Sequence, residues 1–180
     1  MTTYLAFLRA INLGATRTFP KDDIRRAVES AGFTGVETHL NTGNVRFDTA
    51  MRSRGLIEQV LEQAFVADRG FEVPTVVYMT AEFTQIARTA AALSAERPDL
   101  VRDYVYLLKD ELGPDAAAAV EATRTDRGEM VVRGRAAHAL LGPGYEPGAV
   151  DPLGAAKLLG VATNRNVNVV TTLAQKWCGA

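Results

Sequence analysis

The order of apolar patterns along residues 1–80 constrains the fold more than any other feature of this chain. Compact or alternating apolar runs, typical of β-strands, lie at 3–8, 36–40, 45–48 and 75–79. Apolar residues at helical spacing fill 20–31 and 56–65, between the first two runs and between the last two. The resulting βαββαβ order is the split βαβ, or ferredoxin-like, arrangement. Right-handed connections then favour the spatial strand order 4-1-3-2, with strands one and three central and antiparallel.

The second half, residues 81–180, also alternates between helical and strand patterns. The predicted helices are at 83–90, 114–122, 155–159 and 170–177, and the predicted strands are at 104–108, 130–132 and 136–141. Residues 104–160 thus follow a βαββα order like that of the first half, without a residue-level repeat. The prediction is an α+β fold. A ferredoxin-like βαββαβ N-terminal half, 1–80, is packed closely against a smaller α/β C-terminal half, 81–180. The two halves are expected as subdomains, and whether they count as one domain stays open.

The composition is that of an ordinary globular protein. The chain has 180 residues, of which 47% are hydrophobic and 23% charged, and its net charge is −1. No global field therefore attracts it to nucleic acid or to anionic lipid. The single cysteine, Cys178, cannot form an internal disulfide, the N-terminus lacks a signal-peptide pattern, and no apolar run reaches membrane-spanning length. We expect a cytoplasmic protein with no membrane partner.

Two polar stretches stand at the ends of predicted strands. Arg9-Ala10-Ile11-Asn12-Leu13-Gly14 follows the strand at 3–8, and Asn41-Thr42-Gly43-Asn44 lies between strands two and three. Because strands one and three are antiparallel neighbours, the end of one lies beside the start of the other. Both stretches should therefore meet at one end of the sheet, where Gly14 and Gly43 would let the backbone approach a ligand closely.

These stretches have a structural and a functional interpretation. Asn and Gly are the residues that a tight hairpin needs, because both tolerate positive φ, and Arg9 or Asn12 could simply hold a loop together. As a binding site, the stretches would recognise an anion beside the N-terminus of the helix at 20–31. Asp22 and Asp23 count against a phosphate there, since their charge already satisfies the helix dipole.

A third polar stretch, Thr163-Asn164-Arg165-Asn166-Val167-Asn168, precedes the predicted helix at 170–177. Its simplest role is an N-cap, in which a side-chain oxygen accepts a hydrogen bond from a free helix N–H group. That role does not require Arg165 or Asn168. Topology alone does not place this stretch near the first two.

No pattern in the chain specifies catalysis. Two histidines, His39 and His138, and one cysteine do not have the spacing of a zinc site, and His138 fits the core of a strand. The serines lie in or near helices without a nucleophile elbow, and no phosphate-binding or dinucleotide-binding glycine motif is present. We predict no metal and no cofactor, and we leave open whether the protein is an enzyme.

The three polar stretches together resemble those of DUF1697, an uncharacterised bacterial family. Its members carry an Arg-Gly-Ile-Asn-Val-Gly type motif after strand one, Ser-Gly-Asn in the hairpin and Thr-Arg-Asn-Trp-Asn near the C-terminus; the corresponding residues here are 9–14, 42–44 and 164–168. Ala10 replaces the family's first glycine, Val167 replaces its tryptophan, and a Ser-Lys pair frequent in the family is absent from 150–153. The resemblance implies the fold and the positions of the motifs, and it implies no activity.

The leading functional hypothesis is a binding site for a small anionic ligand that bears a phosphate or a carboxylate. Arginine suits forked contacts with either group, and asparagine supplies oriented hydrogen bonds. The candidate ligand-binding residues are Arg9, Asn12, Gly14, Asn41, Thr42, Gly43, Asn44, Arg165 and Asn166.

Two alternatives stay open. One is binding of a nucleic-acid backbone by a set of arginines, namely Arg9, Arg17, Arg46 and those of the turn Arg133-Gly134-Arg135. Base stacking of RNA on the sheet is not expected, because strand three presents Arg46 and Asp48 rather than aromatic side chains. The other alternative is a structural module that forms a homodimer through a sheet edge.

Overall fold

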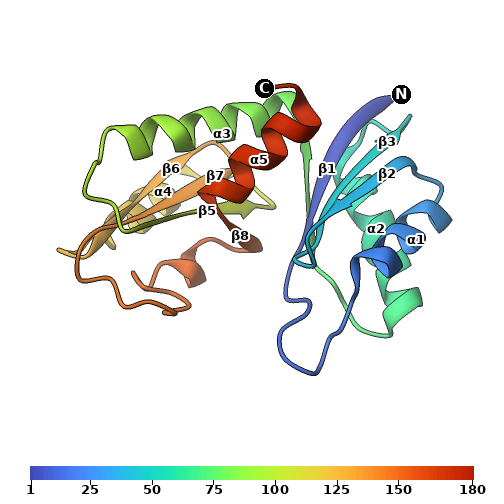
Figure 1. The fold of residues 1–180 in the computed structure, drawn as a ribbon, viewed down its shortest axis with the longest axis horizontal. Coiled ribbons are helices and arrows are strands. Elements are labelled where there is room, and N and C mark those ends of the chain that lie inside the picture. Colours follow the sequence, from blue (N-terminus) through green and yellow to red (C-terminus); the bar gives the residue numbers. More distant parts are fainter. The chain divides into compact units, whose positions relative to one another are not determined.

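The computed structural model describes residues 1–180, which form two compact units, Met1–Phe83 and Thr84–Ala180. Each unit contains one four-stranded antiparallel sheet with helices packed on it (Figure 1). Helix α3 (Thr80–Ala95) begins in the N-terminal unit and continues into the C-terminal unit. The expected packing of the two halves on each other stays a prediction.

The N-terminal unit has the predicted βαββαβ order. Its elements are β1 (Thr2–Leu8), α1 (Lys21–Ser30), β2 (Thr34–His39), β3 (Asn44–Thr49), α2 (Arg54–Arg69) and β4 (Thr75–Met79). The strands are arranged β2-β3-β1-β4, and every neighbouring pair is antiparallel. This is the 4-1-3-2 order expected from the sequence, so the ferredoxin-like prediction is confirmed. Helices α1 and α2 lie on the same side of the sheet (Figure 1).

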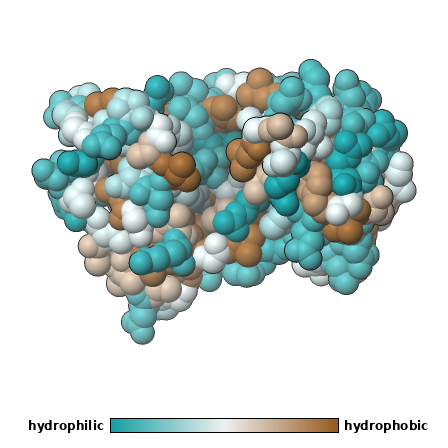
Figure 2. Space-filling model, turned by 90° about the horizontal axis from the view of Figure 1, so that it is seen from below, coloured by the Kyte–Doolittle hydropathy of each residue, from teal (hydrophilic) through white to brown (hydrophobic).

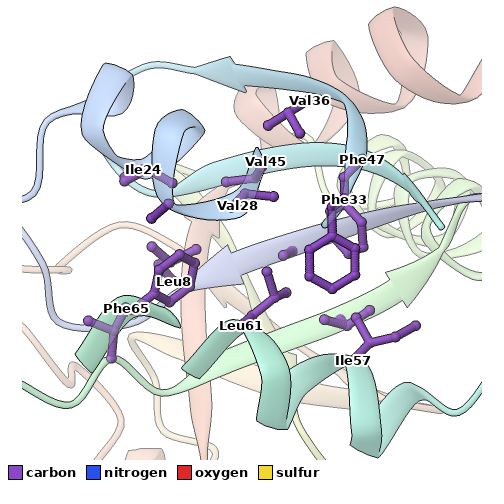
Figure 3. Close-up of a cluster of buried hydrophobic side chains, with 14 of the residues drawn as sticks. Leu8, Ile24, Val28, Phe33, Val36, Val45, Phe47, Ile57, Leu61 and Phe65 are labelled. Atoms are coloured by element: carbon purple, nitrogen blue, oxygen red, sulfur yellow. The ribbon is translucent and has the colours of Figure 1, made fainter. Parts of the chain in front are cut away.

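The core of the N-terminal unit lies between this sheet and the two helices (Figure 3). Tyr4, Ala6 and Leu8 of β1 face the helices because successive side chains of a strand point to opposite faces. The helices contribute apolar residues at helical spacing: Ile24, Ala27 and Val28 from α1, and Ile57, Leu61 and Phe65 from α2. Burial of one large apolar side chain contributes about 1.5–3 kcal/mol to stability. The cluster therefore holds the end of β1 and the start of β3 in place.

Two carboxylates close the outer edge of β4. The N–H of Val77 donates to Oε1 of Glu58 at 3.0 Å, and the N–H of Thr75 donates to Oε1 of Glu62 at 2.9 Å. Glu58 and Glu62 lie one turn apart on α2. Two N–H groups on the outer edge of β4 therefore donate to carboxylates from successive turns of the helix. Glu58 is buried and is paired with Arg54 at 3.4 Å. An incoming strand therefore finds these donors already occupied.

The C-terminal unit repeats the same strand order. Its elements are β5 (Arg102–Leu108), α4 (Pro114–Glu121), β6 (Gly128–Arg133), β7 (Ala136–Leu141), a single 3-10 turn η1 (Ala156–Leu158), β8 (Ala162–Asn166) and α5 (Val167–Cys178). The arrangement β6-β7-β5-β8 becomes β2-β3-β1-β4 when the four strands are numbered within their own unit. The predicted α-helix at 155–159 is wrong, because only the 3-10 turn forms there, and β8 was not predicted at all.

Matching backbone hydrogen bonds relate the two sheets in detail. The N–H of Leu8 donates to Gly43 O at 2.8 Å, and the N–H of Leu108 donates to Arg135 O at 3.0 Å. One residue further on, Arg9 N–H donates to Pro74 O at 2.9 Å, as Lys109 N–H donates to Val161 O at 2.9 Å. These bonds use only main-chain atoms. The C-terminal sheet can therefore repeat the topology of the N-terminal sheet without repeating its sequence.

The helices of the chain do not include a membrane-spanning segment, since none is both long and apolar enough. On the face of the molecule shown in Figure 2, hydrophobic residues occur in small scattered groups among hydrophilic and intermediate ones.

Candidate functional site

The first two polar stretches meet at one end of the N-terminal sheet. The side-chain Nδ2 of Asn12, in the loop after β1, donates to the backbone oxygen of Asn41 in the β2–β3 turn at 2.6 Å. The N–H of Leu8 donates to Gly43 O at 2.8 Å immediately before that loop. Antiparallel pairing of β1 with β3 produces this meeting, as the sequence argument expected.

Asn12 closes the loop that joins β1 to α1. Its Nδ2 also donates to Phe19 O at 2.9 Å, its Oδ1 accepts from Phe19 N–H at 2.7 Å, and its own N–H donates to Arg17 O at 2.9 Å. Both amide hydrogens of Asn12 thus have protein acceptors. The amide holds the loop in place, and a direct contact between Asn12 and a ligand stays a prediction.

The asparagines of the turn also serve the scaffold. Oδ1 of Asn41 accepts from the N–H of Lys21, the first residue of α1, at 3.2 Å. Asn44 is buried, and its Nδ2 donates to His39 O and to Oγ1 of Thr42, both at 2.9 Å. These contacts tie the turn to the helix and fix its shape, which is the structural interpretation of the motif.

Gly43 and Gly14 occupy different environments. Both have positive φ, 77° and 70°. A Cβ on Gly43 would lie 2.6 Å from Leu8 Cβ and 3.1 Å from Ile11 Cδ1, whereas a Cβ on Gly14 would meet nothing within 4 Å. Gly43 is therefore required by close packing of the turn against β1, and Gly14 by backbone conformation alone.

The backbone of the loop after β1 alternates in the sign of φ. Ala10, Asn12 and Gly14 have φ of 56°, 53° and 70°, and the residues between them have negative φ. Alternation of this kind occurs in nests, in which successive N–H groups point toward one concave side and bind anions. The exposed N–H groups of residues 13–15 donate to no protein acceptor, whereas residues 14 and 15 form a turn that the N–H of Thr16 closes. We call residues 9–17 the exit loop.

Two of the basic residues at this end of the sheet have unpaired side chains. Arg9 and Lys21 are exposed, and neither side chain makes a hydrogen bond or ion pair with the protein. Arg17 differs, because its Nε donates to Ala10 O at 2.6 Å and its Nη2 to Glu72 O at 2.5 Å. Its guanidinium also lies 4.7 Å from the centre of the Phe71 ring. Arg17 therefore braces the exit loop, and Arg9 and Lys21 supply accessible charge.

The acidic residues at the start of α1 divide in the same way. Asp23 pairs with Arg26 at 2.8 Å and with Arg69 at 3.2 Å, which neutralises its charge locally. Asp22 is exposed and lacks such partners. One of the two carboxylates that oppose an anion is thus already paired.

Arg165 and Asn166 belong to the C-terminal unit and lie on β8. Arg165 pairs with Val105, and Asn166 pairs with Tyr104 one residue away, so strand alternation sends their side chains to opposite faces. Arg165 is buried, and its Nη1 donates to Thr163 Oγ1 at 2.8 Å and to Asn164 O at 2.7 Å. Burial lowers the pKa of Arg165 to about 10. Participation of either residue in the site of the exit loop stays a prediction.

Asn166 has the capping role that the sequence suggested. Its Oδ1 accepts from the N–H of Asn168 at 2.8 Å, at the start of α5. Helix α5 itself begins at Val167 despite the β-branched residues there. The N-cap interpretation of the third polar stretch is therefore confirmed for Asn166.

The remaining titratable candidates lie in the C-terminal unit, where His138 is buried and Cys178 is partly buried. His138 on β7 lies opposite Val105 and Val131, and its Nε2 has no hydrogen-bond partner. Burial, and to a lesser extent the charge of Arg133, lowers the pKa of His138 to about 4, so the ring is neutral near pH 7. Burial raises the pKa of the Cys178 thiol, which a hydrogen bond with Thr84 partly offsets. No cluster of three metal-ligating side chains occurs.

Sequence reasoning did not identify Lys21 or the bracing role of Arg17. Lys21 follows Pro20, the N-cap residue of α1, so its proximity to the turn could have been inferred from the helix start. No sequence pattern indicates the role of Arg17, because it depends on a positive φ of 59° at a residue that rarely adopts one.

The two sheets share one strand order, and the N-terminal unit has the full ferredoxin-like βαββαβ order, so the chain is an α+β protein. Residues 1–138 match the family described as "Protein of unknown function (DUF1697)", and the chain belongs to this family. Its structure is similar to that of the conserved bacterial protein SP0830 from Streptococcus pneumoniae. The TM-score is 0.72 at 20% sequence identity, and the match covers 97% of each chain. That likeness supports the fold. No curated protein matches the sequence.

Proposed function

We propose that this protein binds a small anion, a phosphate or a carboxylate, at the exit loop of its N-terminal unit. The observation that carries the proposal is the set of exposed N–H groups at residues 13–15, which have no protein acceptor. The alternating φ of the preceding residues supports it, because nests of this type bind oxyanions. The free guanidinium of Arg9 adds a charged, forked donor at the base of the same loop.

Backbone strain in the exit loop supports the same proposal. Ala10, Asn12 and Arg17 are non-glycine residues with φ between 53° and 59°. Each left-handed residue of this kind costs roughly 1–2 kcal/mol and persists only where surrounding contacts hold it. Such strain concentrates at functional sites. The hydrogen bonds of Asn12 and Arg17 supply those contacts and pre-organise the loop before a ligand arrives.

The charge distribution favours a singly or doubly charged ligand over a polyanion. Arg9 and Lys21 attract an anion, while Asp22 opposes it. The net charge of −1 gives no long-range attraction for an extended phosphate chain. Recognition would therefore depend on short hydrogen bonds from the loop.

The experiment is a titration with inorganic phosphate and, separately, with acetate, followed by the amide chemical shifts of the protein. We expect shifts concentrated at residues 13–16, and a Kd raised about tenfold by Arg9→Ala, which removes one charge-assisted contact. Arg52→Ala is the matched control, because Arg52 is exposed but follows β3 at the opposite end of the sheet. Absence of shifts in the loop at high concentrations of both anions would overturn the proposal.

Both alternatives have less support. Of the arginines that would contact a nucleic-acid backbone, Arg17 braces the exit loop, Arg46 pairs with Asp48 at 2.8 Å, and Arg133 pairs with Glu121 at 3.4 Å. Dimerisation through β4 would displace the carboxylates that already cap its outer edge. Neither alternative accounts for the strained exit loop.

A further inference from the structure

Two exposed leucines lie at this end of the sheet, one in the exit loop and one in the neighbouring β2–β3 turn. Leu13, within it, is 66% exposed, and Leu40, in the β2–β3 turn, is 50% exposed. Each is the sequence neighbour of one partner in the 2.6 Å hydrogen bond that joins Asn12 to Asn41. Both leucines are therefore next in sequence to a contact that lies beside the unpaired N–H groups of residues 13–15.

Leu40 is not the residue that the fold requires at its position. Its φ is 60°, in the left-handed region, where Asn and Gly are the residues that turns normally use. A leucine there is strained, and its half-exposed side chain gains little from burial in the core. Packing and turn geometry thus leave the choice of leucine unexplained.

Leu13 presents the same combination. It lies between Asn12 and Gly14, which both have positive φ, at the tip of a loop that the Asn12 amide closes below it. The side chain has two-thirds of its surface exposed, while the backbone N–H beside it has no protein acceptor. A ligand held by that N–H group would pass directly beside the leucine.

We infer that the anion of the proposed function is carried on an apolar body, and that Leu13 and Leu40 contact this body while the exit loop holds the charged group. This inference rests on the proposed function and narrows it to organic monophosphates or carboxylates with an aliphatic or aromatic moiety. Such a ligand removes apolar surface from water on both sides of the contact, which a sugar or glycerol moiety does not.

The test compares three phosphates by isothermal titration calorimetry: inorganic phosphate, glycerol phosphate and hexyl phosphate. The two esters carry the same charged group and differ in the polarity of the body. We expect hexyl phosphate to bind about tenfold more tightly than glycerol phosphate, because burial of a few tens of Å² of apolar surface has an effect of that size.

Variants identify the contact. The double variant Leu13→Ser/Leu40→Asn should bind both esters equally, and Asn suits the left-handed φ at position 40, so folding is not compromised. Leu56→Ser is the matched control: Leu56 is 49% exposed but lies in the first turn of α2, away from the loop, and the preference should persist.

The outcomes separate the two proposals. Equal binding of both esters by the unmodified protein, or a preference that survives in the double variant, would overturn the inference about the apolar body and leave anion binding intact. Binding of none of the three phosphates, nor of hexanoate, would remove the proposed function together with this inference.

Discussion

Asn12 and Phe19 are joined by two reciprocal hydrogen bonds, from Asn12 Nδ2 to Phe19 O at 2.9 Å and from Phe19 N–H to Asn12 Oδ1 at 2.7 Å. The side-chain amide thereby takes the place of a peptide group in a short antiparallel bridge. Seven positions separate the two residues, so the bridge closes the loop and leaves the N–H groups of residues 13–15 at its tip without a protein acceptor.

Asn12→Ala should destabilise the N-terminal unit by about 2 kcal/mol. The substitution removes three hydrogen bonds and leaves the N–H and oxygen of Phe19, as well as the oxygen of Asn41, without their protein partner. Urea denaturation measures the loss. Thr16→Ala is the control, since Thr16 is exposed at the tip of the same loop and should change stability by less than about 0.5 kcal/mol. Equal effects of the two substitutions would contradict the closing role of Asn12.

Ala10→Gly should stabilise the protein by up to about 1 kcal/mol. Ala10 has a φ of 56°, which glycine adopts without strain, and the relief exceeds the extra entropy that glycine gives the unfolded chain. The corresponding motif of the DUF1697 family has glycine at this position. Ala15→Gly provides the comparison, because Ala15 has negative φ and should lose about 0.5 kcal/mol in the same denaturation experiment. A loss of stability at both positions would show that the strain at Ala10 is absent.

Gly43→Ala and Gly14→Ala should differ in severity. At Gly43 an added Cβ would approach Leu8 Cβ to 2.6 Å in addition to the cost of positive φ, and we expect a loss of about 3 kcal/mol or more. At Gly14 only the backbone term applies, which is about 1 kcal/mol. Thermal unfolding followed by circular dichroism ranks the two variants. The reverse ranking would show that the turn moves away from β1 at little cost.

Elements with apolar periodicity were predictable from the sequence, and polar ones were not. Strand β1 and helix α2 show regular apolar positions, and both form where they were expected. Strand β8 escaped prediction because its buried positions are Thr163 and Arg165, whose polarity hides the alternation. Burial of Arg165 is supported by hydrogen bonds to Thr163 Oγ1 and Asn164 O, two residues and one residue before it in the chain, and no apolar pattern reveals such acceptors.

The meeting of the first two polar stretches was predictable from the sequence, but which of their groups stay free to contact a ligand was not. Strand pairing brought Asn12 and Asn41 together as topology required. Whether their amides face a ligand or the backbone depends on the positive φ of Ala10 and Arg17, which no propensity predicts for those residue types. Apart from the side chains of Arg9 and Lys21, the donors left for a ligand are therefore main-chain N–H groups, which carry no signature in the sequence.

Loss of the two edge-capping carboxylates should cause self-association. Glu58→Leu/Glu62→Leu leaves the N–H groups of Val77 and Thr75 uncapped on the outer edge of β4. We expect a stability loss of about 1–3 kcal/mol per uncapped group and concentration-dependent oligomers in light scattering, because a free edge recruits strands from other molecules. Gln59→Leu/Gln63→Leu adds the same apolar surface to exposed positions of α2 and should leave the oligomeric state unchanged. If both double variants formed oligomers to the same extent, surface hydrophobicity, and not the free strand edge, would be the cause of association.

His138 should make the stability of the C-terminal unit depend on pH below neutrality. Burial lowers its pKa to about 4 in the folded protein, against 6.5 in the unfolded chain. Well above pH 6.5 the ring is neutral in both states, and His138 adds nothing to the pH dependence of stability. As the pH falls from 6.5 toward 4, the unfolded chain binds a proton that the folded protein refuses, so the free energy of unfolding decreases. The full difference between the two pKa values corresponds to about 3 kcal/mol.

The measurement is urea denaturation of the protein at pH 7.0 and pH 5.0, followed by a signal from the C-terminal unit. In this pH range carboxylates contribute least to the pH dependence of stability. We expect the unmodified protein to lose about 2 kcal/mol between these values, and His138→Leu to lose little, because leucine packs between Val105 and Val131 without a titrating group. His39→Gln removes the chain's other histidine, which lies in the N-terminal unit, and should retain the loss. An undiminished pH dependence in His138→Leu would place the acid-sensitive group elsewhere in the unit.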